Sequence, residues 1–528
     1  MNIWIVSHAC SGSSEAGGVK NVTYSLCKEF YRSGHNPVLF IPVFGCTNFR
    51  EIKGMQRNVV EAKVDISGKT ERIEYTLAYS DKWNFKICFV EHPAFAEKEG
   101  VYTYTHNEEL KNSSHKKGCG HEDTLFLDIL FAKAVCEFGK HISESEIPDI
   151  IHCQDASTAT LPLFTSHTEK LKNVKTIVTI HNAGPAYHHN FSNPDEAAWY
   201  TGFNRDVFSN CLNDGKPEPF LIASEYGALL TTVSPVYAEE LTDPKNRVLT
   251  DGLSSIFAEK HIPVSGITNG IDVDLYEPGD TEKSGLPFAF SPEKGDLQGK
   301  YECRSFFLKH LLKNAEDECN VLESIKKYGY LEFEKSEKKS KTVYLCYQGR
   351  LASQKGLSLF ADCLPSLLEN FPFLKVIITG QGESALEGRF VSLADNPDFK
   401  GRLVFLNGYN KLAARLTVAS SDFICLPSFF EPCGLEDFIA QIYGTLPVAH
   451  RTGGFNKILN NKTGFLYEKN IKENLIAKLS EVITLKMYSP DSVIDMITEA
   501  ARYTRNEYNW DKVSENEYIP LFENLVNK

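Results

Sequence analysis

Short apolar runs rich in β-branched residues recur along the first half of the chain, each followed by polar turn residues and a helical pattern. Such near-continuous hydrophobicity is typical of strands in a parallel sheet that is covered on both faces. Apolar positions at helical spacing predict a helix over residues 19–31, which Gly34 can end. The predicted strands of this half cover residues 3–7, 37–43, 86–91, 149–153, 175–181 and 228–234.

The second half repeats this plan, with predicted strands at residues 342–348, 374–380, 403–406, 422–427 and 446–449. A chain of 528 residues is too long to fold around one hydrophobic core, so two doubly wound α/β domains are expected. We predict domains at residues 1–265 and 266–500, with residues 501–528 forming a helix that returns to the first domain. Ligands of such a pair are expected in a cleft between the carboxyl ends of their strands.

A charged stretch, residues 277–341, separates the two series and is interpreted as mostly helical. Its Lys/Glu/Ser-rich end, EFEKSEKKSKT, is interpreted as a solvated surface loop. Composition adds further limits, because 42% hydrophobic and 24% charged residues describe a globular chain. A net charge of −13 argues against nucleic acid as a main partner.

The chain has fourteen cysteines without paired CxxC spacing, mostly in apolar surroundings, which favours buried thiols in a reducing cytosol. It shows neither a signal peptide nor an apolar run of about 18 residues that would span a membrane. We therefore expect a cytoplasmic protein with no membrane partner. The sequence does not predict its oligomeric state.

Four stretches combine strand ends with reactive side chains. After the first strand, the Gly17–Gly18 turn suits a phosphate, although Glu15 places a carboxylate at its lip. After a strand in the second half, Arg350 and Lys355 follow five residues apart and suit a diphosphate, the alternative being a surface loop with incidental cations. The other two stretches lie at residues 427–454 and around residue 181.

The segment 427–454 is the most informative, because a strand ends at Pro427 and Glu431 then stands before a helix of apolar period. The intervening turn exposes backbone N–H groups to an anion or polar ligand, while the alternative is a helix-capping glutamate. A second loop, Arg451–Gly454, also suits close backbone approach. Elsewhere His181 ends a buried strand, where it can bind a sugar hydroxyl or play a structural part.

A metal site is one interpretation of residues 106–121, which contain the possible ligands His106, His115, Cys119 and His121. Their spacing matches no zinc pattern, so a solvated loop is preferred. The pair His188–His189 is interpreted in the same way. We therefore predict no metal site and no cofactor.

Taken together, the motifs resemble those of bacterial glycogen synthases and plant starch synthases. They are, in order, EAGGV, IIHCQD, TIHN, VSP, GITNGID, YQGRLASQKGL, FLNGY, PSFFEPCGLE, YGTLPVAHRTGG and TGFLYE. The resemblance implies a GT-B fold and a retaining transfer of glucose from ADP-glucose to the non-reducing end of an α-1,4-glucan. Its partners would be that nucleotide-sugar donor and a glycogen-like acceptor.

The resemblance also implies roles for individual residues. Arg350 and Lys355 would bind the diphosphate, Glu431 would face the donor glucose, and His181 would hold the transferred glucose. Asp155 and Asn182 would lie on the acceptor side. The remaining donor-binding residues would be Gly17, Gly18, Asn269, Gln354, Tyr409, Cys433, Gly434, Leu435, Thr452, Gly453 and Gly454.

Three positions depart from the family pattern: Glu15 stands where a lysine is common, Asn21 where an aspartate is common, and Glu436 where a threonine is common. An active enzyme must therefore direct Glu15 away from the phosphates or pair it, and Lys20 is the nearby cation. The helix dipole would also favour Glu15. A donor such as UDP-glucose, another acceptor, and an inactive glucan-binding homologue are the alternatives.

Overall fold

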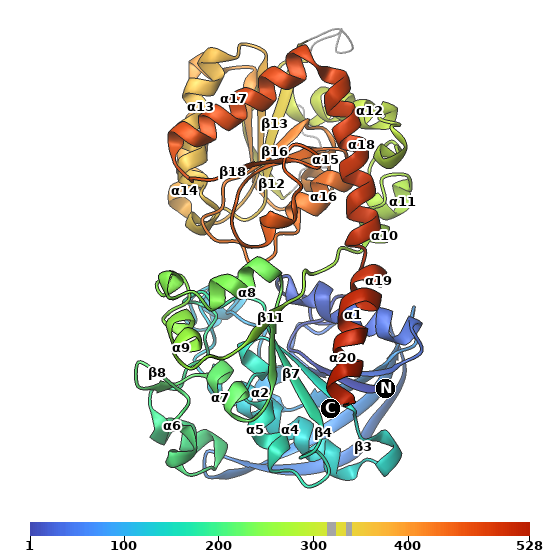
Figure 1. Cartoon of the computed structure of the whole chain (residues 1–528), viewed down its shortest axis with the longest axis vertical. Coiled ribbons are helices and arrows are strands. Elements are labelled where there is room, and N and C mark those ends of the chain that lie inside the picture. The colour runs from blue at the N-terminus through green and yellow to red at the C-terminus, as the bar shows by residue number, and fades with distance from the viewer. Residues whose placement is uncertain (314–323, 334–340, 528) are drawn as a thin grey trace. The chain divides into compact units, whose positions relative to one another are not determined.

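The computed structural model describes residues 1–313, 324–333 and 341–527. Most of the Lys/Glu/Ser-rich piece predicted as a surface loop, residues 334–340, lies outside them. The chain divides into two compact units, each built on its own sheet (Figure 1). Unit 1 comprises residues 1–270 and 510–528, and unit 2 comprises residues 271–509.

Unit 1 holds a nine-stranded sheet in which seven neighbouring strands run parallel and two long strands close one edge as an antiparallel ribbon. The order is β11 (Val264–Gly266), β10 (Leu229–Thr232), β7 (Lys175–Ile180), β6 (Ile150–Gln154), β1 (Asn2–Val6), β2 (Asn36–Pro42), β5 (Lys86–Glu91), β4 (Lys69–Ser80) and β3 (Ile52–Ile66). The six strands predicted from apolar runs are confirmed to within three residues at each end.

The β3–β4 ribbon was missed because its apolar residues alternate with charged ones instead of forming a run. Its turn is tight, since Ser67 and Gly68 both have positive φ angles of 53° and 71°, as two-residue hairpin turns with a right-handed strand twist require. Alternation along Ala62, Val64 and Ile66 buries one face of β3 against the unit.

Helix α1 (Val19–Arg32) confirms the predicted first helix, and Gly34 follows it with a φ of 81°. Its buried face packs against the C-terminal helices α19 (Trp510–Val513) and α20 (Ile519–Val526), which lie beside it in Figure 1. The other helices of unit 1 are α2 (Pro93–Ala96), α3 (His106–Lys111), α4 (Thr124–His141), α5 (Leu161–Ser166), α6 (Pro194–Thr201), α7 (Pro219–Glu225), α8 (Pro235–Leu241) and α9 (Leu253–Glu259), and a small hairpin pairs β8 (Leu212–Asn213) with β9 (Lys216–Pro217).

Unit 2 holds a seven-stranded sheet that is parallel except for its first strand. The order is β12 (Ile325–Leu331), β15 (Arg402–Gly408), β14 (Leu374–Gly380), β13 (Val343–Gln348), β16 (Phe423–Leu426), β17 (Leu446–His450) and β18 (Phe465–Tyr467). Strand β12 corrects the expectation that residues 277–341 are mostly helical. It pairs antiparallel along the whole of β15, which satisfies the backbone groups that it directs toward that strand.

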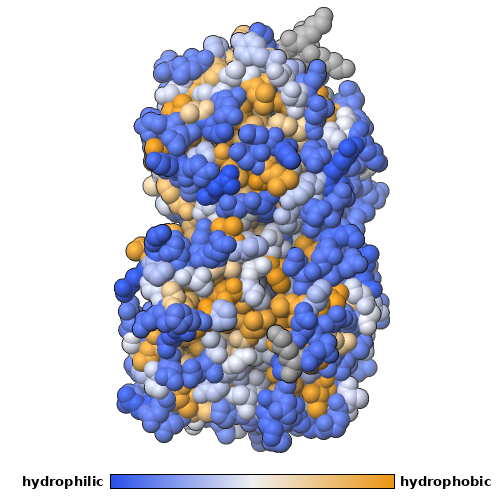
Figure 2. Space-filling view, viewed as in Figure 1, coloured by the Kyte–Doolittle hydropathy of each residue, from blue (hydrophilic) through white to orange (hydrophobic). Residues whose placement is uncertain are grey.

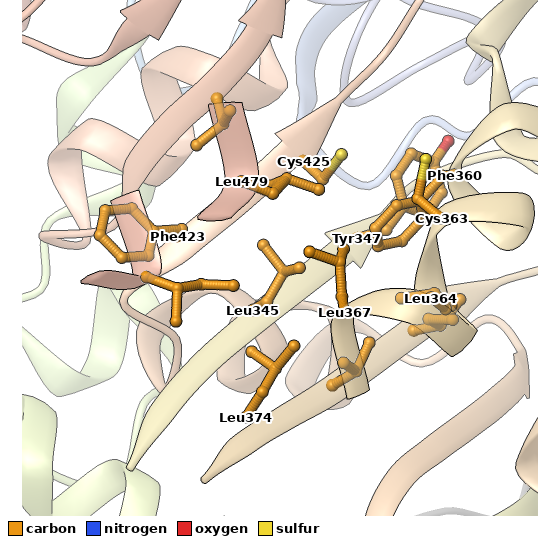
Figure 3. Close-up of a cluster of buried hydrophobic side chains, with 14 of the residues drawn as sticks. Leu345, Tyr347, Phe360, Cys363, Leu364, Leu367, Leu374, Phe423, Cys425 and Leu479 are labelled. Carbon is orange, nitrogen blue, oxygen red and sulfur yellow. The ribbon is translucent and has the colours of Figure 1, made fainter. Parts of the chain in front are cut away.

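Side chains from both faces of that sheet are buried. Figure 3 shows one such cluster, in which β13, β14 and β16 meet α13 (Leu357–Asn370) and α17 (Lys472–Tyr488). The other helices of unit 2 are α10 (Val273–Tyr276), α11 (Thr281–Ser284), α12 (Gln298–Phe307), α14 (Ser384–Ala394), α15 (Lys411–Ala419), α16 (Glu436–Ile442) and α18 (Pro490–Glu507).

The observed boundaries differ from the expected ones at residues 265 and 500. The chain passes from unit 1 to unit 2 between residues 270 and 271, and it returns to unit 1 between residues 509 and 510. Helix α18 continues through residue 500 because its later turns are buried in unit 2, where Thr504 donates a hydrogen bond to Gln441 of α16. Only residues from Trp510 onward join unit 1, so the returning segment is shorter than predicted.

On the face drawn in Figure 2, hydrophilic residues cover most of the surface and apolar residues lie scattered among them. In the described part of the chain, no helix is both long and apolar enough to cross a membrane.

Candidate active site

The carboxyl ends of the parallel strands in unit 2 carry most of the predicted donor-binding residues. Strand β13 leads into Arg350, whose side chain is exposed, and into a short helical turn that contains Gln354 and Lys355. Strand β16 leads into Glu431, and the two loops are tied together where Gln354 donates its side-chain amide to Phe430 O over 3.1 Å. The loops after neighbouring strands therefore form one site.

Lys355 and Glu431 form the central ion pair of this site. Lys355 Nζ donates to Glu431 Oε2 over 2.5 Å, and Ser428 Oγ donates to the same oxygen over 3.1 Å. The Lys355 side chain is 19% exposed and that of Glu431 is 9% exposed. Burial alone would lower the pKa of Lys355, but the carboxylates of Glu431 and Glu436 outweigh it, so the pKa is raised. Lys355 is thus a cation with ammonium donors left for a ligand.

Two glycines allow the loop before α16 to fold. Gly434 has a φ of 75°, and a Cβ there would lie 2.5 Å from the ring of Phe455. At Gly454 a Cβ would lie 1.9 Å from Cys433 O, while its amide donates to Glu431 O over 2.8 Å. The loops 431–435 and 452–454 therefore pack backbone on backbone, which brings Glu431, Cys433, Leu435, Thr452 and Gly453 together in the sequence-predicted arrangement.

A buried lysine holds the backbone of the loop 431–435 in place. Lys457 donates to the carbonyl oxygens of Cys433 and Gly434, and its Nζ lies 3.1 Å from Asp437 Oδ1. Burial raises the pKa of Asp437 to about 6 in spite of Lys457. The Asp437–Lys457 pair was not predicted from the sequence. No local pattern signals it, because Asp437 lies opposite the apolar positions of α16 and Lys457 is 20 residues further along the chain.

Glu436, one of the departures, lies beside the cations. Its Oε1 is 3.9 Å from the point that a Cβ of Gly349 would occupy, and its Oε2 accepts a hydrogen bond from Leu435 N over 3.3 Å. The carboxylate also contributes to the raised pKa of Lys355. The candidate diphosphate site therefore carries an extra negative charge.

His181 and the predicted acceptor-side residues of unit 1 lie at the carboxyl ends of β6 and β7. His181 Nε2 donates to Gln154 Oε1 over 2.9 Å, and burial lowers the pKa of His181 to about 4, so it is neutral at pH 7. The backbone amide of His181 donates to Asp155 Oδ1 over 3.3 Å. Asn182 stays next to them and caps its own turn through Gly184 N.

Asp155 has an unusual backbone and an unusual side chain. Its φ and ψ angles are 65° and −178°, a region that is otherwise occupied almost only by glycine. Burial raises the pKa of its carboxyl to about 7, while His189 and backbone amides act in the opposite direction. Strain of this kind concentrates at functional sites, which supports the prediction for this residue.

Glu15 is paired. Its carboxylate accepts hydrogen bonds from Lys20 Nζ and, over 2.7 Å, from Gly12 N. These partners confirm that the Glu15 charge is balanced locally. They do not include an N–H of the first turn of α1, so the expected helix-dipole contribution is not what holds the side chain. Asn21 lies half-buried in that turn.

The adjacent glycines face open space. Gly17 has a φ of 56°, whereas Gly18 has ordinary right-handed angles. Within the described residues, no atom lies within 4 Å of the position that a Cβ would take at either glycine. The fold itself therefore does not require a glycine at position 18.

The last two predicted residues lie apart from these groups. Asn269 follows β11 in unit 1 and is 4% exposed, and within the described residues its Oδ1 has no hydrogen-bond partner. Tyr409 follows β15 in unit 2 and is 65% exposed. An exposed aromatic ring at a strand end can stack on another ring.

His188 and His189 lie outside helices and strands, as predicted, but their imidazoles are bonded within the protein and are not solvated as expected. His188 lies 3.3 Å from Glu218 and donates to Ala183 O over 2.9 Å. His189 Nδ1 donates to Asp128 of α4. Both imidazoles are held by carboxylates distant in sequence, so no local pattern reveals them. His121, in the stretch set aside as a loop, is likewise buried and bonded to Gly100 O.

Across the described ranges, no group of three or more His, Cys, Asp or Glu side chains is placed to hold a metal ion. The sequence expectation of a metal-free site stays a prediction.

Comparison with known proteins identifies the family. Residues 2–258 match the model of the starch synthase catalytic domain, and residues 331–503 match that of glycosyl transferases group 1. The glycogen synthase of Thermodesulfovibrio yellowstonii is 28% identical over all of this chain and 98% of its own length. That of Flavobacterium johnsoniae is 26% identical, covering 100% and 99%.

The chain belongs to the glycogen and starch synthase family. The catalytic domain of starch synthase IV from Arabidopsis thaliana, solved with ADP and acarbose, superposes with a TM-score of 0.79 at 21% identity, covering 100% of this chain and 99% of that one. This likeness shows the GT-B fold. The chain is thus a glucosyltransferase of the glycogen synthase type, and the sequence prediction of family and fold is confirmed.

Proposed function

We propose that this glycogen synthase homologue transfers glucose from ADP-glucose to the non-reducing end of an α-1,4-glucan and keeps the α configuration. The bond between the anomeric carbon and the diphosphate breaks, and a bond from that carbon to the acceptor O4 forms, with loss of the hydroxyl proton. The chemistry requires a stabilised diphosphate and a stabilised positive charge at the sugar.

Arg350 and Lys355 are proposed to stabilise the diphosphate. Arg350 is exposed at the end of β13, and Lys355 lies one short turn further along the same loop. Fixed cations aimed at a leaving group are worth several kcal/mol where water is excluded. With this charge supplied by the protein, we expect the reaction to need no metal. Addition of a chelator should leave its rate unchanged.

Glu431 is proposed to face the donor sugar. Its Oε2 already accepts from Lys355 and Ser428. Glu431 is thus held as a carboxylate that can offset positive charge developing at the anomeric carbon, while Cys433, Gly434 and Leu435 offer backbone groups to the donor. The rest of the donor site would be formed by Gln354, Thr452, Gly453 and Gly454. Tyr409 would stack on the adenine.

In unit 1, His181 is proposed to hold the transferred glucose. Because Nε2 donates to Gln154, the neutral ring has Nδ1 left to accept from a sugar hydroxyl. Asp155 and Asn182 are assigned to the acceptor, Asn269 to the donor, and Gly17 and Gly18 to backbone contact with either substrate. The carboxylate of Asp155 suits a sugar hydroxyl, which donates well to an anion.

The observation that carries the proposal is the Lys355–Glu431 pair at the ends of parallel strands, held by glycine-dependent loops. The test measures incorporation of labelled glucose from ADP-glucose into glycogen. We expect Lys355→Ala and Glu431→Ala each to lower kcat by at least 100-fold while glycogen binding is unchanged. Full activity in Glu431→Ala would overturn the assigned role, and wild-type protein that binds glycogen without turnover would indicate an inactive homologue.

A further inference from the structure

Three ionisable side chains of unit 1, Asp128, Asp155 and His189, interact on the predicted acceptor side, and the proposed mechanism uses only Asp155. His189 is hydrogen-bonded through Nδ1 to Asp128 Oδ2, and Asp155 lies within electrostatic range of the same imidazole. The three come from separate parts of unit 1: the start of α4, the end of β6 and the loop after β7. One imidazole is thus hydrogen-bonded to one carboxylate and interacts electrostatically with a second.

The surroundings of the His189 imidazole favour its protonated form. Burial acts to lower the pKa of His189, but Asp128 and Asp155 outweigh it, so the pKa is raised. The neighbouring His188 acts in the opposite direction and is the smallest of the named influences. The Asp128 side chain is 6% exposed and that of His189 is 22% exposed. One side of the ring therefore stays accessible while the other is held.

A second histidine is kept neutral next to the pair. His8 follows β1 and is 4% exposed, with Nε2 3.7 Å from Asp128 Oδ1. Burial lowers its pKa to about 4. Within the described residues its Nε2 has no hydrogen-bond partner. Asp128 therefore pairs with a single cation, His189.

We propose that His189, anchored by Asp128, is a positioning residue of the transfer reaction and supplies the positive charge that faces the Asp155 carboxylate. This inference rests on the proposed function, since Asp155 is assigned to the glucan acceptor. Asp155 also faces the hydroxyls of Tyr102 and Tyr237, which carry no charge at neutral pH. No other side-chain cation among its strongest electrostatic partners in the described residues counters its burial.

The sign of the effect follows from this geometry. The pKa of Asp155 is about 7, and the charge on His189 keeps it from rising further. Removing that charge raises the pKa, so a larger part of Asp155 is protonated at neutral pH. A protonated carboxyl accepts sugar hydroxyls less well, and activity is lost on the acidic side of the profile.

The test compares pH profiles of kcat and of the glucan KM for wild type, His189→Gln and Asp128→Asn. We expect the acidic limb of His189→Gln to move up by about one pH unit, with recovery above pH 9. Asp128→Asn should shift it in the same direction but less, because both charges of the pair are then lost. A uniform loss at all pH values in folded His189→Gln protein, or an unshifted limb, would overturn the proposal.

The matched control is His141→Gln on the same helix. His141 also pairs with a carboxylate, Glu137, and lies about 20 Å from Asp128 along α4. Its profile should equal that of wild type. Carboxyl-carbon NMR of labelled aspartate, assigned with Asp155→Asn, reads the Asp155 pKa directly. The midpoint of the Asp155 titration must rise in His189→Gln even if the protein transfers no glucose. Failure of this inference is therefore distinct from failure of the proposed function.

Discussion

Glu15 illustrates how a single reversed charge is accommodated at the residue scale. Its carboxylate is shared between Lys20 and the amide of Gly12, and it stays 48% exposed. The reversal is thus local to the turn before α1.

Glu15→Lys places a second lysine next to Lys20 and removes the acceptor of Gly12 N. We expect a loss of about 1–2 kcal/mol in unfolding free energy, and no gain in donor affinity. Reversing the pair in Glu15→Lys/Lys20→Glu should restore the part of the stability due to the ion pair. Denaturant unfolding and the donor KM measure the two effects. A donor KM that falls tenfold in Glu15→Lys would mean that position 15 faces the diphosphate.

Glu436 has a different consequence, because its carboxylate faces the Lys355 ammonium that the diphosphate needs. Glu436→Thr should lower the donor KM by about tenfold at low salt, with a smaller effect at 0.5 M salt, since screening weakens the repulsion. Glu436→Gln keeps the shape and should reproduce most of the change. A donor KM that rises in both variants would show that Glu436 contacts the donor favourably.

At the scale of elements, two glycine turns that look alike in sequence have different requirements. Gly434 is confined by its left-handed φ and by the ring of Phe455, whereas Gly18 has ordinary angles and open space around it. The first glycine serves the fold. The second has no structural requirement within its own unit, so its requirement, if the proposal holds, comes from substrate.

The variants Gly434→Ala and Gly18→Ala should therefore differ in their effects on stability and on glucose transfer. Gly434→Ala should lower the unfolding free energy by about 2–4 kcal/mol through strain and overpacking. Gly18→Ala should change stability by less than about 0.5 kcal/mol and still reduce transfer by at least tenfold. Thermal unfolding and initial rates decide this. Normal transfer by Gly18→Ala would remove Gly18 from the substrate contacts.

Elements also show how far sequence reasoning reached. Apolar runs predicted most of the parallel strands but missed the three-residue strands β11 and β18, and glycine and charge spacing pointed to Arg350, Lys355 and Glu431, because those signals are local. In the β3–β4 ribbon apolar residues alternate with polar ones, so a search for continuous apolar runs missed it. The Asp128–His189 and His188–Glu218 pairs join residues 61 and 30 positions apart, so only the folded chain brings them together.

At the scale of the whole molecule, unit 1 is completed by the end of the chain. Trp510 is 2% exposed, and a Cβ at Gly270 would lie 2.8 Å from its indole. Tyr518 and Phe522 extend the same contact onto α1 through Phe30. Unit 1 therefore cannot form its full core before residues 510–522 are made.

Trp510→Ala should lower the stability of unit 1 by about 3–5 kcal/mol. If the units unfold separately in calorimetry, the transition of unit 1 should move down while that of unit 2 stays nearly unchanged. The control is Tyr488→Ala, at an exposed site on α17 of unit 2, which should leave both unfolding transitions nearly unchanged. An unchanged unit 1 transition in Trp510→Ala would contradict the packing described.

The most direct test of the whole account is the choice of donor. Wild-type protein is incubated with glycogen and, in separate reactions, with glucose-labelled ADP-glucose and UDP-glucose, and label in new α-1,4 links is counted. The account predicts efficient transfer from ADP-glucose, a kcat/KM for UDP-glucose at least tenfold lower, and loss of transfer in Lys355→Ala. Equal or better use of UDP-glucose, or transfer that survives Lys355→Ala, would contradict it.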